Sequence, residues 1–145
     1  MLWIAGHGYD DGREFYVIKL GQTIRYGDMI SVSIDFTGFL NDDLNGFYKS
    51  SYIDSESGDS KWLASTHFES THARRAFPCF DEPTMKATFQ VNLGRTPDMS
   101  SISNMPKIEE GVPIPGTGYV WDIYSQSVRM STYLVAFVVS DFVFR

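Results

Sequence analysis

The residues best suited to chemistry lie in one short stretch of the chain, between Thr66 and Pro83. Within these eighteen residues the sequence places two histidines, a cysteine, three carboxylates and two arginines. Such side chains can serve as metal ligands, as nucleophiles or as general acids and bases. Three chemistries are therefore possible here: a zinc site, a thiol nucleophile, and a pair of cooperating carboxylates.

The two histidines do not have the spacing of a helical zinc site. That motif places two histidines four residues apart, with a glutamate directly after the first. His67 and His72 are five residues apart, and neither is followed by glutamate. On a helix their imidazoles would point roughly 140° apart. The sequence therefore disfavours a metal site built from this stretch.

The thiol and the carboxylates also have simpler interpretations. A lone cysteine between a proline and a phenylalanine, as at Cys79, is more often a small buried apolar residue than a nucleophile paired with a histidine such as His72. Asp81 and Glu82 are adjacent, so in an extended chain they point to opposite faces rather than sharing a proton. We expect them to cap a turn before Pro83 or to pair with one of the arginines at positions 74 and 75.

The elements that position this stretch are predicted to be strands. Apolar and polar residues alternate over residues 30–37 and 85–93, which is the period of a half-buried strand. Aromatic and β-branched residues fill 15–18, 121–124 and 133–139. The last of these runs is predicted to be a central strand buried on both faces. Together they indicate an all-β fold, an antiparallel β-sandwich or a set of open, barrel-like sheets.

Turn-forming residues separate these strands. Glycine, proline, asparagine and aspartate concentrate at 38–46, 55–60 and 106–118, which we predict to be loops. Residues 71–76 could form a single helical turn, and Pro83 would prevent its extension.

Composition limits the possible functions. A chain of 145 residues with 43% hydrophobic and 15% aromatic residues is long and apolar enough for one folded domain. Its net charge of −6 disfavours nucleic acid as a partner. The longest apolar run, at 133–139, is much shorter than the roughly 20 residues of a membrane-spanning helix, so no membrane segment is predicted in this chain. Residues 1–9 lack the pattern of a secretory signal.

The stretch at 73–83, Ala-Arg-Arg-Ala-Phe-Pro-Cys-Phe-Asp-Glu-Pro, followed by Met-Lys-Ala-Thr-Phe at 85–89, resembles the hallmark of the alanyl aminopeptidase (aminopeptidase N) family of zinc metallopeptidases. Residues 40–48 and 130–142 resemble the same family, in the same order. The resemblance identifies residues 14–145 as a partial amino-terminal β domain of this type. Residues 1–13 form an unmatched start segment.

The resemblance implies a function for the parent enzyme. Members remove single residues from peptide amino-termini with a zinc ion held by a His-Glu-x-x-His motif and a distant glutamate. These motifs do not occur in this sequence. We therefore expect the chain to lack the catalytic zinc domain, to bind no cofactor itself, and to be inactive alone. Its implied partners are the amino-terminus of a peptide substrate and the helical catalytic domain.

The resemblance also implies two substrate-binding residues. In the family, the polar stretch ahead of Ala-Arg-Arg lies at the mouth of the active site and helps bind the first substrate residue and its amino group. Glu69 corresponds to a carboxylate there, which suits a protonated amine. His67 stands where the family usually has glutamine, and its charged form would repel that amine. The simpler alternative is an exposed strand-end carboxylate beside a surface histidine.

Two other hypotheses remain at this point. The chain could be a stand-alone binding module in which Trp62 and Trp121 form a flat sugar or peptide platform, exposed on one face. It could also be a small hydrolase that uses Cys79, which requires a thiol of lowered pKa near His72.

Overall fold

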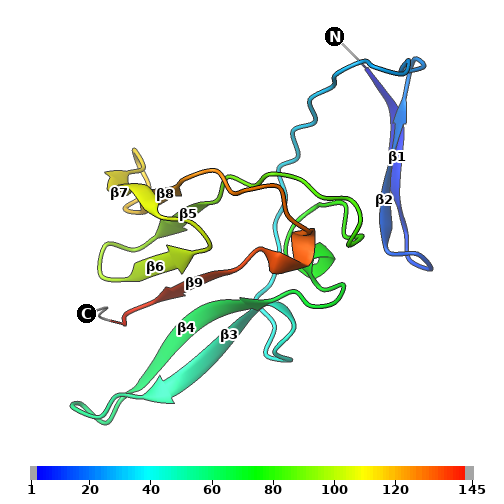
Figure 1. Ribbon diagram of the computed structural model, residues 1–145. Coiled ribbons are helices and arrows are strands. Elements are labelled where there is room, and N and C mark those ends of the chain that lie inside the picture. The colour runs from blue at the N-terminus through cyan, green and yellow to red at the C-terminus, as the bar shows by residue number, and fades with distance from the viewer. Residues whose placement is uncertain (1–2, 143–145) are drawn as a thin grey trace. The chain divides into compact units, whose positions relative to one another are not determined.

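Antiparallel strands form nearly all of the regular structure in the computed structural model, which describes residues 3–142 (Figure 1). Two short 3₁₀ turns complete it, and the described residues contain no α-helix and no closed barrel. The all-β prediction is therefore confirmed. The chain divides into two compact units, one ending at Phe36 and the other beginning at Thr37. The predicted boundary after residue 13 stays a prediction.

The first unit is a β-hairpin. Strand β1 (Ile4–Asp10) pairs antiparallel with β2 (Phe15–Leu20), and the register places Tyr9 opposite Tyr16. The connecting turn is closed by Arg13, whose guanidinium donates two hydrogen bonds to the Asp10 carboxylate at 3.0 and 2.7 Å. The predicted strand at 15–18 is thereby confirmed as part of β2.

The predicted strand at residues 30–37 is wrong. The segment is not part of any strand among the described residues, and its alternating apolar side chains are exposed. Periodicity shows which side chains could share a face. A strand also needs a neighbouring backbone to take its N–H and C=O groups, and within residues 3–142 this segment has none.

The second unit contains two sheets (Figure 1). The four-stranded sheet has the order β3-β4-β9-β6, with each neighbouring pair antiparallel. The three-stranded sheet has the order β5-β8-β7 and is also antiparallel. The strands of the first sheet are β3 (Gly46–Ile53), β4 (Ser60–His67), β9 (Phe137–Ser140) and β6 (Ser100–Ser103). Those of the second are β5 (Asn92–Arg95), β8 (Val120–Tyr124) and β7 (Lys107–Pro113).

Strand β8 confirms the prediction at 121–124, and the turn at 55–60 and the loop before Gly46 are also as expected. The run at 133–139 does supply an inner strand, since β9 lies between β4 and β6. It is shorter than predicted because a 3₁₀ turn, η2 (Thr132–Leu134), occupies its start. Only Ser140 of β9 is fully buried, so burial on both faces is wrong.

Two further predictions need correction. Of the segment 85–93, only the end belongs to β5. Before it the pairing is irregular, because the Phe89 amide donates to the Ser127 side-chain oxygen at 2.9 Å instead of to a carbonyl. The region 106–118 is not entirely a loop, since it contains β7, a strand whose register against β8 shifts twice.

The apolar core of the second unit lies beneath the Ala-Arg-Arg stretch. Phe68, Ala73 and Val135 are buried together, and aromatic rings pack around them. Phe68 makes edge contacts with Phe77 and Phe137 at centroid distances of 5.9 and 6.0 Å. The predicted single helical turn is confirmed as η1 (Ala73–Arg75).

Candidate functional site

The end of β4 presents both candidate substrate-binding residues to solvent. Burial alternates, with His67 exposed, Phe68 buried in the core and Glu69 exposed. The strand is anchored just before them, because the Thr66 hydroxyl accepts a hydrogen bond from the Phe137 amide (3.0 Å) and donates one to the Phe137 carbonyl (3.3 Å). Phe68 is thus buried between two residues whose side chains are open to solvent, His67 at the last position of β4 and Glu69 two residues beyond it.

The Glu69 carboxylate takes part in no ion pair or hydrogen bond between residues within 3–142. Its cationic neighbour in the sequence, Arg74, is instead held by Asp81. The Arg74 amide and its Nε atom both donate to Asp81 Oδ2, each at 3.1 Å. This confirms the expected pairing of Asp81 with an arginine, and it leaves the charge of Glu69 uncompensated by Arg74.

A loop formed by residues 41–46, the 41–46 loop, contacts His67. The ring Nδ1 atom of His67 lies 3.1 Å from the carbonyl oxygen of Leu44, a geometry in which the ring donates. On the other side of Leu44, the Asp43 carboxylate accepts a hydrogen bond from Arg75 at 3.1 Å. Gly46 ends the loop with a φ of +72°, directly beside the Arg75 side chain. The loop is thus tied to both the end of β4 and η1.

The remaining candidates do not form a catalytic centre. Burial raises the pKa of the Cys79 thiol to about 11, and the negative charge of Asp81 adds to this effect. A nucleophilic cysteine needs the opposite shift, so the cysteine-hydrolase hypothesis is not supported. The described residues also offer no group of three or more histidine, cysteine or acidic side chains that could hold a metal ion. They do not fit the zinc that the family resemblance implies for the whole enzyme.

The tryptophans of the binding-module hypothesis lie on two different sheets. Trp62 is on β4, exposed by 56%, with the Lys49 ammonium 5.6 Å from its ring centroid. Trp121 is on β8, and its ring lies against Gly94 of the neighbouring strand. Both rings reach solvent, but strands of separate sheets carry them, which does not favour a single flat platform.

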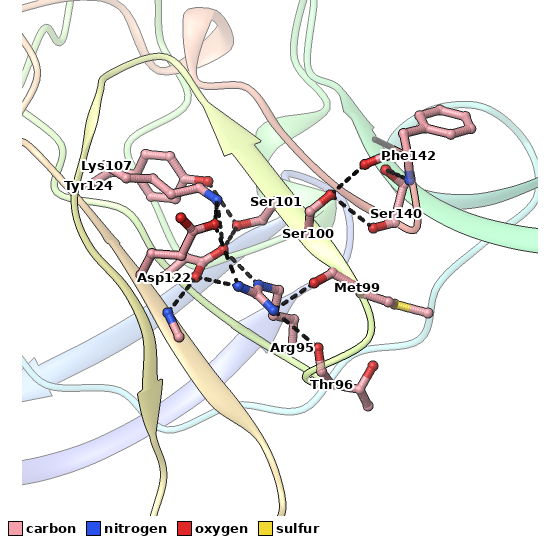
Figure 2. Close-up of polar contacts among 12 residues, drawn as sticks. Arg95, Thr96, Met99, Ser100, Ser101, Lys107, Asp122, Tyr124, Ser140 and Phe142 are labelled. Carbon is pink, nitrogen blue, oxygen red and sulfur yellow. Dashed lines mark hydrogen bonds and ion pairs between the residues drawn. The ribbon is translucent and has the colours of Figure 1, made fainter. Parts of the chain in front are cut away.

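The sequence did not reveal a buried polar network centred on Asp122 (Figure 2). Arg95 donates two hydrogen bonds to the Asp122 carboxylate, at 2.7 and 2.9 Å, and the Gly111 amide donates a third at 3.0 Å. Ser101 and Lys107 also contact it. Burial alone would raise the pKa of Asp122, but these donors outweigh it and hold the pKa well below its usual range.

This network joins the two sheets. Asp122 and Arg95 belong to β8 and β5, whereas Ser101 lies on β6 of the four-stranded sheet and also contacts the Tyr124 hydroxyl at 2.8 Å. Asp122 is fully removed from solvent. Its role is therefore structural, since no ligand could reach it. The available signal was an aspartate inside an otherwise apolar strand, Val-Trp-Asp-Ile-Tyr at 120–124.

No helix among residues 3–142 is both long and apolar enough to cross a membrane.

The fold and the site define a class: an antiparallel β domain in which a strand end carrying an exposed carboxylate is packed against an Ala-Arg-Arg turn. Residues 5–134 match the model of the Peptidase M1 N-terminal domain. The chain belongs to this family.

Similar proteins are aminopeptidases. The chain is 46% identical over 129 residues to endoplasmic reticulum aminopeptidase 1 of Mus musculus, covering 89% of this chain and 14% of that protein. It is 42% identical over 131 residues to aminopeptidase N of Bos taurus, covering 89% and 13%. It is 44% identical over 133 residues to puromycin-sensitive aminopeptidase of Caenorhabditis elegans, covering 92% and 14%. The chain thus spans only a small part of the length of these relatives.

Proposed function

We propose that this chain is the amino-terminal β-domain part of a zinc-dependent aminopeptidase that removes single residues from peptide amino-termini. In this proposal Glu69 and His67 form part of the wall that binds the substrate amino-terminus, and a helical domain outside this chain holds the zinc. The observation that carries the proposal is the Glu69 carboxylate: it is exposed, and within residues 3–142 it has no cationic partner.

The chemistry of recognition follows from charge. A peptide amino-terminus is an ammonium group near neutral pH, whereas an internal peptide bond has no charge to offer, so a carboxylate at this position selects for free ends. An ion pair between this carboxylate and an ammonium group, if fully exposed to solvent, contributes only about 0–1 kcal/mol to binding. A water-excluding neighbour would raise the contribution to about 1.5–3 kcal/mol. The domain alone should therefore bind peptides weakly, but it should prefer peptides with a free amino-terminus.

The direct test is a titration of the isotopically labelled chain, followed by NMR, with a short peptide bearing a free amino-terminus and with its acetylated counterpart. We expect the free peptide to shift the amide signals of residues 66–72, and the acetylated peptide to do so several times less at equal concentration. Glu69→Gln should remove this difference. Glu56→Gln, which changes an exposed carboxylate in the β3–β4 turn, is the matched control and should preserve it.

Two outcomes would overturn the proposal. One is equal binding of the free and acetylated peptides by the unmodified chain. The other is release of an aminoacyl reporter by this chain with zinc added, because the proposal places the catalytic metal outside it.

A further inference from the structure

Leu44 is unusual in its backbone conformation and in its exposure. It is one of two non-glycine residues within 3–142 whose φ is positive, at +61°. Its side chain is apolar yet 56% exposed. A positive φ is costly for a residue with a branched side chain, by roughly 1–2 kcal/mol, and such conformations persist only where the surroundings enforce them.

The surroundings of Leu44 do enforce it. The Asp43 carboxylate accepts hydrogen bonds from Arg75 (3.1 Å) and from the Asn45 amide (3.3 Å). The Leu44 carbonyl accepts the hydrogen bond from the His67 ring. The backbone on both sides of Leu44 is therefore fixed, and an apolar side chain is held out into solvent.

This exposed leucine stands beside the proposed amino-terminus site. Its carbonyl is within hydrogen-bonding distance of His67, and His67 and Glu69 are both exposed and only two residues apart in the sequence. The residue that carries the candidate ammonium-binding carboxylate and the residue that presents an exposed apolar side chain are thus both near His67, Glu69 along the chain and Leu44 through its carbonyl. When the first residue of a peptide is apolar, it carries an ammonium group and an apolar side chain, which these two residues would complement.

We propose that Leu44 is a specificity-determining residue, which contacts the side chain of the substrate residue whose ammonium group Glu69 binds and thereby favours apolar first residues. Because this rests on the proposed function, the test has to separate the two. The probes are the tripeptides Leu-Gly-Gly and Gly-Gly-Gly, both with free amino-termini, titrated into the labelled chain.

The chain should bind Leu-Gly-Gly about fivefold more tightly than Gly-Gly-Gly, a ratio that corresponds to partial burial of one leucine side chain. Leu44→Asn keeps a residue that tolerates positive φ and removes the apolar contact. It should bring the ratio close to one by weakening the binding of Leu-Gly-Gly. Leu44→Gly, which relieves the backbone strain, should do the same and guards against misfolding of the first variant.

The matched control is Ile53→Asn, an exposed apolar residue at the opposite end of β3. It should leave the ratio at its original value. Binding of both peptides without a leucine preference, a preference that survives both Leu44 variants, or an equal loss in the Ile53 variant would each overturn the role of Leu44 while leaving that of Glu69 intact. Failure of both peptides to bind would overturn the proposed function and this inference with it.

Discussion

Arg95 on β5 and Asp122 on β8 are diagonal neighbours across the strand pair and are joined by two hydrogen bonds, Nε to Oδ2 at 2.7 Å and Nη2 to Oδ1 at 2.9 Å. Both residues are almost removed from solvent. Taking such charges out of water is costly, and the cost is offset only while the pair and its further hydrogen bonds stay complete. The remaining Arg95 nitrogen is satisfied by the Met99 carbonyl at 2.6 Å (Figure 2).

Removing the charge of Asp122 should therefore destabilise the fold strongly. Asp122→Asn leaves the buried Arg95 guanidinium with the largely exposed Glu110 carboxylate, 3.7 Å away, as its remaining counter-charge. We expect a loss of about 3 kcal/mol or more in the free energy of unfolding. Urea denaturation followed by tryptophan fluorescence measures this. Glu109→Gln, an exposed carboxylate on β7, is the matched control and should change stability by less than about 0.5 kcal/mol. Similar losses in both variants would contradict the role assigned to the network.

The lowered pKa of Asp122 predicts how the free energy of unfolding changes at acidic pH. The pKa of Asp122 in the folded chain lies below its ordinary value of 3.8, so the folded state binds this proton less readily than the unfolded state. Asp122 therefore contributes its full stabilisation above about pH 5, and the contribution falls as the pH drops through 4 and below.

The measurement is the free energy of unfolding of the original chain and of Asp122→Asn between pH 7 and pH 2. The difference between the two should be constant from pH 7 to 5 and should narrow steadily below pH 4. Two other carboxylates also have lowered pKa values, Asp54 mainly through a hydrogen bond from Lys61 and Asp141 mainly through one from Tyr52. Both are present in the two proteins, so their contributions to the pH dependence cancel in the difference. A difference that stays constant down to pH 2 would exclude an ionised, hydrogen-bonded Asp122 as its source.

How far the sequence predicts this structure depends on the range of the interactions involved. Strands β2 and β8 follow from local composition, because aromatic and β-branched side chains suit a pleated surface. The segment 30–37 has an equally clear period and forms no strand among the described residues, since pairing depends on another part of the chain. The Asp122 network was missed for a related reason: a charged residue in a strand is ordinarily read as facing solvent, and its partner Arg95 is 27 residues away.

In the candidate site, too, the local features follow from the sequence and the long-range contacts do not. The family resemblance points to Glu69 and His67, and both are exposed on either side of the buried Phe68. The contact between His67 and Leu44 spans 23 residues and depends on the turn before β3, so neither spacing nor periodicity indicates it. By contrast, Arg74 and Asp81 are only seven residues apart, so the local sequence predicts their pairing.

Gly46 offers a test of how the 41–46 loop is held in place. An added Cβ atom would lie 2.9 Å from the Arg75 Cβ atom and 3.3 Å from the His72 carbonyl oxygen, and the φ of +72° is itself unfavourable for alanine. Gly58, in the β3–β4 turn, has a similar φ of +75° but has open space where the Cβ atom would be. The two glycines therefore share the backbone strain and differ in the steric clash.

We expect Gly58→Ala to cost about 1 kcal/mol from backbone strain alone, and Gly46→Ala to cost clearly more, about 2 kcal/mol or above. Only Gly46→Ala should also shift the NMR signals of Leu44 and His67, because relief of the clash moves Arg75 and with it the Asp43 ion pair. Equal costs for the two variants, with unchanged Leu44 and His67 signals, would mean that the loop is not braced against Arg75. In that case the rigid presentation of Leu44 beside Glu69 would lose its structural basis.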